Sequence, residues 1–209
     1  MKLVLGARRN DRIIHNPDTL LIAYRNDMGC DYLDYKQVTP KGKVFPEDLA
    51  VTLAVNSQAG WRAFRSLKES AVSINLAKLP DMPLEETSES ERKEVAQFIA
   101  GIARLPGFAA SLATKLLHKK RPQLIPILDN QAIFGAYMNE NWPQLPATSF
   151  SVKGEDWIGK ALDWIFIDLR RSENTSAWKK LLAIEPTRTK IELFDSVWWM
   201  YFRKVQPVR

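Results

Sequence analysis

The chain has 209 residues, of which 45% are hydrophobic and 26% charged, and its formal net charge is +6. This composition excludes a largely disordered chain and is typical of a globular protein with one well-packed core. The single cysteine excludes an internal disulfide framework and favours a reducing, cytoplasmic environment, while the apolar segments are too short or too interrupted by charge to cross a membrane.

Residues 1–45 form the least regular part of the sequence. Glycines and prolines interrupt short apolar runs, and the run at residues 32–35 predicts an arm or a small hairpin. We therefore expect an irregular N-terminal arm over residues 1–45, packed on a main helical domain that spans residues 46–209.

The main domain shows apolar residues at helical spacing in several segments, which predicts an all-α fold. Pro46 followed by two acidic residues is typical of a first helical turn, and the acidic stretch from Glu85 opens another helix. The predicted helices cover residues 46–55, 61–67, 85–104, 157–171 and 189–204. In the last of these, the broad apolar face favours a core helix over a base-stacking platform.

The sequence Leu105-Pro106-Gly107 predicts a tight hairpin between the helix that ends near Arg104 and a second amphipathic helix. Backbone N–H groups in the first turn of that second helix lack intrahelical acceptors, and the helix dipole adds positive charge there. An anion such as a DNA phosphate can dock at this position. Asp129 follows, where a further helix begins.

These residues resemble the helix-hairpin-helix DNA glycosylase superfamily, over about residues 91–120 for the helix-hairpin-helix itself. The family pattern is Leu-Pro-Gly-(Val/Ile)-Gly followed downstream by a catalytic Asp in a Val-Asp or Leu-Asp dipeptide. Leu105-Pro106-Gly107 and Leu128-Asp129 match this pattern. The resemblance implies an orthogonal helical bundle and a role for Asp129 in catalysis.

A closer resemblance over more of the chain is to an uncharacterised bacterial family with a glycosylase-like hairpin. Members of that family end in an Asp-x-x-x-Trp-Met helix, which corresponds here to Asp195, Trp199 and Met200. This second family has no settled activity, so it supports the fold and leaves the function open.

Two departures from the glycosylase pattern change the expected chemistry. Ala109 stands where the second hairpin glycine is expected, so the turn is either distorted or has an ordinary φ there. Ser111 stands where bifunctional members carry a lysine nucleophile, which implies a monofunctional enzyme without a lyase step. One cysteine cannot hold an iron–sulfur cluster, so we expect no cofactor and no protein metal site, apart from an alkali cation at the hairpin that the resemblance implies.

The resemblance also implies that the hairpin backbone and nearby cations bind double-stranded DNA, and the sequence pI of about 9.4 agrees with a polyanionic partner. Many proteins carry such a basic excess for solubility alone. The residues expected at the DNA are Gly107, Phe108, Ala109, Ser111, Lys115, Lys119, Lys120, Arg121 and Gln58.

Gln58 is similar to a glutamine that fills the gap left by a flipped base, although a surface polar residue on a helix is the simpler interpretation. The helix through Trp61 and Arg62 lines a groove in one interpretation, and in the other it buries its aromatic residues and exposes its cations. Both questions stay open at the level of sequence.

Asp129 also has two interpretations. An Asp at this position is a good helix N-cap, worth about 1 kcal/mol, and needs no catalytic role. In a glycosylase it would stabilise the positive charge that develops on the sugar as the base departs. The two roles are compatible.

A proton donor for the departing base is missing from the expected place, which Leu53 or its neighbours occupy. This absence argues against adenine-type chemistry, whereas a labile alkylated base departs without an acid. Our hypothesis is therefore a monofunctional DNA glycosylase that acts on a damaged or modified base. The alternatives are a noncatalytic DNA-binding or lesion-sensing protein and a helical interaction module. The oligomeric state does not follow from the sequence.

Overall fold

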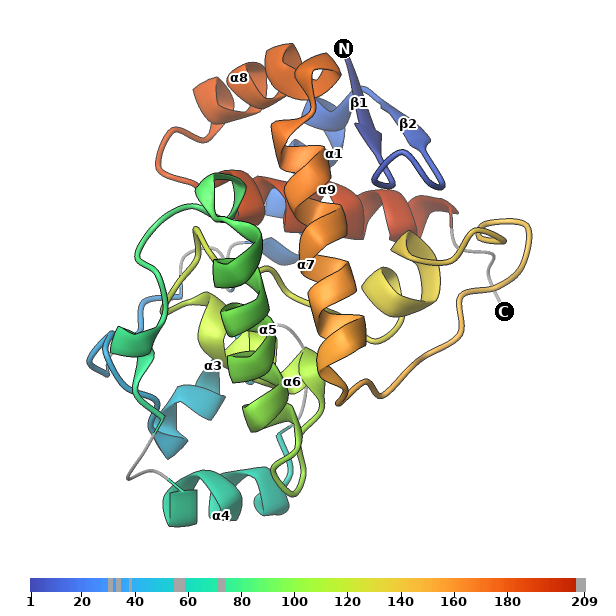
Figure 1. Ribbon diagram of the computed structural model, residues 1–209. Coiled ribbons are helices and arrows are strands. Elements are labelled where there is room, and N and C mark those ends of the chain that lie inside the picture. The colour runs from blue at the N-terminus through green and yellow to red at the C-terminus, as the bar shows by residue number, and fades with distance from the viewer. Residues whose placement is uncertain (30–31, 33–34, 38, 55–58, 71–73, 206–209) are drawn as a thin grey trace.

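The computed structural model describes residues 1–29, 32, 35–37, 39–54, 59–70 and 74–205. The protein is mainly helical, as predicted, with one small antiparallel sheet of two strands (Figure 1). None of the described helices is both long and apolar enough to cross a membrane.

The α-helices are α1 (Pro17–Tyr24), α3 (Val51–Ala54), α4 (Trp61–Ser70), α5 (Glu89–Ala103), α6 (Ala110–His118), α7 (Glu155–Arg170), α8 (Thr175–Ile184) and α9 (Lys190–Val205). The strands are β1 (Lys2–Leu5) and β2 (Arg12–His15). Short 3₁₀ helices cover Pro46–Ala50, Leu76–Lys78, Leu84–Glu86 and Ser172–Asn174, and π-helical turns cover Arg25–Gly29 and Ala132–Tyr137.

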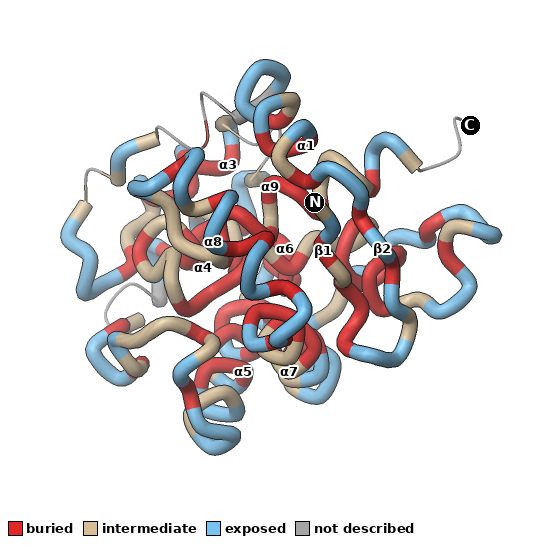
Figure 2. The backbone as a smooth tube through the Cα atoms, turned by 90° about the horizontal axis from the view of Figure 1, so that it is seen from above, coloured by how far each residue is buried: buried red, intermediate tan, exposed pale blue. Residues whose placement is uncertain are grey.

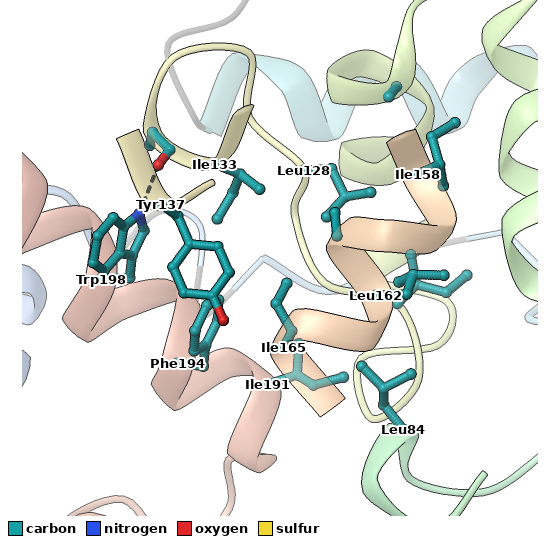
Figure 3. Close-up of a cluster of buried hydrophobic side chains, with 14 of the residues drawn as sticks. Leu84, Leu128, Ile133, Tyr137, Ile158, Leu162, Ile165, Ile191, Phe194 and Trp198 are labelled. Atoms are coloured by element: carbon teal, nitrogen blue, oxygen red, sulfur yellow. Dashed lines mark hydrogen bonds between the residues drawn. The ribbon is translucent and has the colours of Figure 1, made fainter. Parts of the chain in front are cut away.

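The core lies between α5, α6, α7 and α9, and Figure 2 shows buried backbone inside a shell of exposed loops. Helices α5 and α7 pack closely, with Gly159 on α7 facing Ala96 on α5. Aromatic rings form another part of the core, where Tyr137 contacts both Phe194 and Trp198 edge to face (Figure 3). The indole N–H of Trp198 donates to the carbonyl oxygen of Ala132 at 2.8 Å, which holds the π-helical turn on α9.

The N-terminal segment is more regular than its sequence predicts. Strands β1 and β2 pair with Leu3 opposite Ile14, and both side chains are fully buried. Helix α1 then packs on α9. The expected irregular arm is therefore wrong for residues 1–24, whereas the run at residues 32–35 lies largely outside the described residues.

Local signals placed the long helices well. Helix α5 begins at Glu89 because Ser88 and Glu91 form a capping box, with the Ser88 amide donating to Glu91 Oε2 at 2.7 Å. The predicted helix over residues 46–55 divides into the 3₁₀ helix and α3, with Val55 outside the described residues. Helix α8 was not predicted.

Candidate functional site

The hairpin between α5 and α6 has the turn that Leu105-Pro106-Gly107 predicts. The Phe108 amide donates to the Leu105 carbonyl oxygen at 3.0 Å, and Gly107 has φ +85°. Ala109 has φ −147°, which is extended backbone that any residue adopts. The second family glycine is therefore not needed at this position.

Helix α4 supports one side of the hairpin. A Cβ atom on Gly107 would lie 2.6 Å from the backbone N of Ala63, so only glycine fits there. Ser66 Oγ lies 2.8 Å from the Pro106 carbonyl oxygen. Pro106 and Gly107 remain exposed on the other side.

Only some of the backbone amides at the start of α6 lack an acceptor, although all of them were expected to be unpaired and able to bind an anion. The Ala110 amide donates to the Val152 carbonyl oxygen at 2.7 Å, so it is used within the protein. The amides of Ser111 and Leu112 have no acceptor in the described part of the chain. The side chains of Phe108, Ala109 and Ser111 are buried, so any contact with a phosphate at these residues is through the backbone.

The cations predicted to contact DNA lie mostly inside the protein, which corrects the sequence-based assignment. Lys120 Nζ lies 2.8 Å from Asp48 Oδ2, and neither side chain is exposed. Lys119 Nζ lies 3.9 Å from Glu192 Oε1 and 4.4 Å from the centre of the Tyr32 ring. These charges neutralise buried carboxylates and are not offered to a phosphate.

Two further cations predicted to contact DNA are also engaged by groups of the protein. Arg121 donates to the carbonyl oxygens of Lys120 and Lys41 at 3.1 and 3.5 Å. Lys115 Nζ lies 3.5 Å from Asp129 Oδ2, and its side chain is only 11% exposed. Gln58 lies outside the described residues.

A different set of cations surrounds the exposed side of the hairpin. Arg62 directly precedes Ala63 on α4, Arg104 directly precedes the hairpin, and Lys153 follows the residue that accepts from Ala110. All three side chains are exposed, and none forms an ion pair within the described residues. Trp61, which is 72% exposed, stacks on Phe64 beside them. Arg62 was among the cations noted in the sequence. Arg104 could have been found because it directly precedes the hairpin, whereas Lys153 is distant in the chain and is brought near only by the contact of Val152 with Ala110.

A small pocket of about 70 Å³ opens beside α6, several times the space that one water molecule requires. It lies where α1, α3, α6 and α9 meet the segment after residue 126. Its walls are largely apolar and aromatic, and Lys115, Asp129 and Asp195 are its charged or ionisable acid and base side chains. The lining residues are Tyr24, Ala54, Lys115, Ile127, Asp129, Ala132, Ile133, Asp195, Trp198 and Trp199.

Asp129 fulfils the N-cap interpretation and also lines this pocket. Its Oδ1 accepts from the amides of Gln131 and Ala132 at 2.9 and 3.0 Å. Its Oδ2 faces Lys115, and the side chain is 20% exposed. The two amides and the ammonium group hold the carboxylate in one orientation and stabilise its negative charge.

Asp195 is a second carboxyl group in the same pocket. It lies on α9, and its Oδ2 accepts from the Ile127 amide at 3.1 Å. Burial raises the pKa of Asp195 well above its usual range. In the sequence, Asp195 stands out only as part of the Asp-x-x-x-Trp-Met pattern, because it lies 66 positions after Asp129.

His118 is fully buried next to Asp195, with its Nδ1 3.7 Å from Asp195 Oδ2. Nδ1 lies 2.6 Å from the Ile125 carbonyl oxygen and therefore carries the proton that it donates there. Burial lowers the pKa of His118 to about 4, so the ring is neutral at neutral pH. It does not act as a cationic partner for Asp195.

Leu53 stands at the edge of the pocket, next to Ala54, and is 74% exposed. Its side chain is apolar and largely exposed, so it supplies no acid at this position. No three His, Cys, Asp or Glu side chains come together as a metal site among the residues that the structure describes.

Comparison with known proteins gives a family and no described relative. Residues 25–202 match a protein family described as "Family of unknown function (DUF6308)". No curated protein and no solved structure matches the chain.

Proposed function

The chain belongs to this family of unknown function, DUF6308, and we propose that it binds duplex DNA and hydrolyses the N-glycosidic bond of a damaged or modified base. The observation that carries the proposal is the position of Asp129. Its carboxylate is fixed by two amides and Lys115 at the wall of a small aromatic pocket.

The pocket has the chemistry that an extrahelical base requires. The rings of Tyr24, Trp198 and Trp199 line the pocket, and enzymes that act on a base take it out of the stack into an aromatic site of this kind. An oriented carboxylate then stabilises the cation that forms on the sugar as the base departs. Asp129 performs this role, and water attacks the sugar carbon.

The hairpin lies at the right distance to hold the DNA strand. Ser111, whose amide has no acceptor in the described part of the chain, precedes Lys115 by four positions on α6, which is about 6 Å along the helix. A phosphate bound at the exposed hairpin therefore lies within reach of a nucleotide whose base enters the pocket. Arg62, Arg104 and Lys153 supply the cations that attract the backbone.

We expect the wild-type protein to release at least one base from duplex oligonucleotides that carry alkylated, deaminated or oxidised bases. The abasic product is detected as strand cleavage after alkali. Asp129→Asn should lower the single-turnover rate by about 10²-fold or more, because the amide has no charge to stabilise the sugar cation. Duplex affinity should stay within about threefold, since the hairpin is unchanged.

The matched control is Asp163→Asn. Asp163 also pairs with one cation, Arg92, at 2.6 Å, but it lies on α7 away from the pocket. The control should keep full activity. Wild-type protein that releases no base from any lesion, or Asp129→Asn with wild-type activity, would refute the proposal.

A second prediction concerns the lyase step. Lys115 points into the pocket and is largely buried, which corrects the expectation that it reaches outward to a phosphate. Lys115 Nζ is paired with Asp129 Oδ2 at 3.5 Å, so this amine is engaged by a carboxylate and is not placed to attack the sugar carbon. Borohydride treatment during turnover should therefore trap no covalent protein–DNA complex. A trapped complex that disappears in Lys115→Gln would show that the enzyme is bifunctional.

A further inference from the structure

Two carboxyl groups face the same pocket from different elements and in different surroundings. Asp129 comes from the segment after Leu128 and has Lys115 and two amides as partners. Asp195 comes from α9 and has one amide as its hydrogen-bond donor in the described part of the chain. Pairs of carboxyl groups with opposed surroundings divide the roles of acid and charged stabiliser in enzymes that cleave glycosidic bonds.

We propose that Asp195 is the general acid that protonates the departing base, while Asp129 stabilises the sugar cation. The inference rests on the proposed function and names a residue for the step that the sequence left without a proton donor. Leu53, at the expected place of the acid, has no proton to give.

The geometry of Asp195 suits this step. Its Oδ2 is held by the Ile127 amide, whereas Oδ1 accepts no hydrogen bond from any described residue. The side chain is 13% exposed and lines the pocket, so Oδ1 is open to a ligand there. A proton on Oδ1 therefore has no acceptor among the described residues and is available to a base bound in the pocket.

The charges around Asp195 favour its protonated form. No lysine or arginine pairs with it within the described residues, and His118 on α6 is neutral because Nδ1–H is directed to a carbonyl oxygen. Burial and the nearby Glu192 raise the pKa of Asp195, and the Ile127 amide opposes them. The titratable groups that face it are His118 on α6, Tyr24 on α1, Tyr32, Glu192 on α9, and Lys115 and Asp129 across the pocket.

The reaction balances with these two residues and water. The bond between the sugar carbon and the base nitrogen breaks, and its electron pair goes to the base. Asp195 transfers its proton to the base, which departs neutral. A water molecule adds its hydroxyl to the sugar carbon and releases one proton to solvent, from which Asp195 is protonated again.

The test compares two substrates in one enzyme. A base with a positive charge, such as 7-methylguanine, departs as a neutral molecule without an acid, whereas uracil or hypoxanthine departs as an anion unless it is protonated. Asp195→Asn should slow release of the neutral base by about 10²-fold or more and change release of the cationic base by less than about threefold. The asparagine oxygen still accepts from the Ile127 amide, so the pocket keeps its shape.

A pH profile of the wild-type protein gives a second measurement that does not depend on a variant. The single-turnover rate for the neutral base should fall as pH rises and Asp195 loses its proton, and the rate for the cationic base should not. Asp195→Asn should remove this decline.

The outcomes separate the two proposals. Equal losses on both substrates in Asp195→Asn, or no loss on either, would overturn the acid role and leave glycosidic hydrolysis intact. If the wild-type protein releases only the cationic base, the acid role is also overturned and glycosidic hydrolysis stands, since that base departs without an acid. Release of neither base, nor of any other alkylated, deaminated or oxidised base, would overturn the proposed function itself.

Discussion

Replacing Lys120 by methionine is expected to lower the free energy of unfolding by about 3–5 kcal/mol. Lys120 Nζ lies 2.8 Å from Asp48 Oδ2 and also donates to Thr39 Oγ1 and the Pro40 carbonyl oxygen at 2.8 and 2.9 Å. Methionine fills a similar volume but leaves the charge of Asp48 buried without its cation. The loss is large because Asp48 has no exposed surface through which water can reach it.

Chemical denaturation monitored by circular dichroism measures this effect. The exposed Lys68→Met is the control and should change the free energy of unfolding by less than about 0.5 kcal/mol. Adding Asp48→Asn to Lys120→Met should recover part of the loss, because the unpaired charge is then absent. A change below about 0.5 kcal/mol in Lys120→Met would show that the buried pair is not formed.

The same variant tests where the DNA binds. A phosphate contact contributes about −0.9 to the slope of log affinity against log salt concentration. Folded Lys120→Met should keep the wild-type slope, because the ammonium group lies inside the protein. The phosphate contact expected from the sequence position of Lys120 would instead make the slope less steep by about 0.9 in this variant.

Replacing Asp168 by alanine is expected to cost at least about 3 kcal/mol of stability. Asp168 is fully buried on α7 and accepts from the amides of Gly6 and Ala7 at 2.6 and 3.0 Å and from the Tyr137 hydroxyl at 2.7 Å. Alanine leaves three buried donors without an acceptor, and each costs about 1–3 kcal/mol. Arg171, 3.5 Å away, loses a carboxylate partner as well.

Denaturation at pH 7.5 is the appropriate measurement, since burial raises the pKa of Asp168 to about 6 and the group is ionised above that value. Amide hydrogen exchange should also accelerate at Gly6 and Ala7, whose N–H groups lose their acceptor. Asp11→Ala serves as a control, because Asp11 pairs with Arg171 at the edge of the network and is partly exposed. Unchanged exchange at both glycine and alanine amides would contradict the predicted role of Asp168.

Several elements could be predicted from residues that are close in the chain. The capping box of Ser88 and Glu91, the turn at Gly107 and the cap at Asp129 each join atoms within four residues of one another. Their hydrogen bonds form wherever the local backbone allows them, so the sequence is sufficient to place them.

The N-terminal hairpin could not be predicted in this way. Asp168 holds the turn between its strands, and Asn174 exchanges hydrogen bonds with Val4 at 2.8 Å, although about 160 to 170 residues separate these partners. Short apolar runs with glycine between them predict irregular structure when the contacts with Asp168 and Asn174 are not known.

The amino-acid sequence by itself determined the helices α5, α6, α7 and α9, the hairpin between α5 and α6 and the capping role of Asp129, because periodicity and capping act over one or two helical turns. Only the tertiary structure decided which lysines are buried with carboxylates and which cations stay at the surface. It also decided that Asp195 lines the same pocket as Asp129. Burial and charge pairing depend on which distant segments pack together, and a linear pattern contains no record of those neighbours.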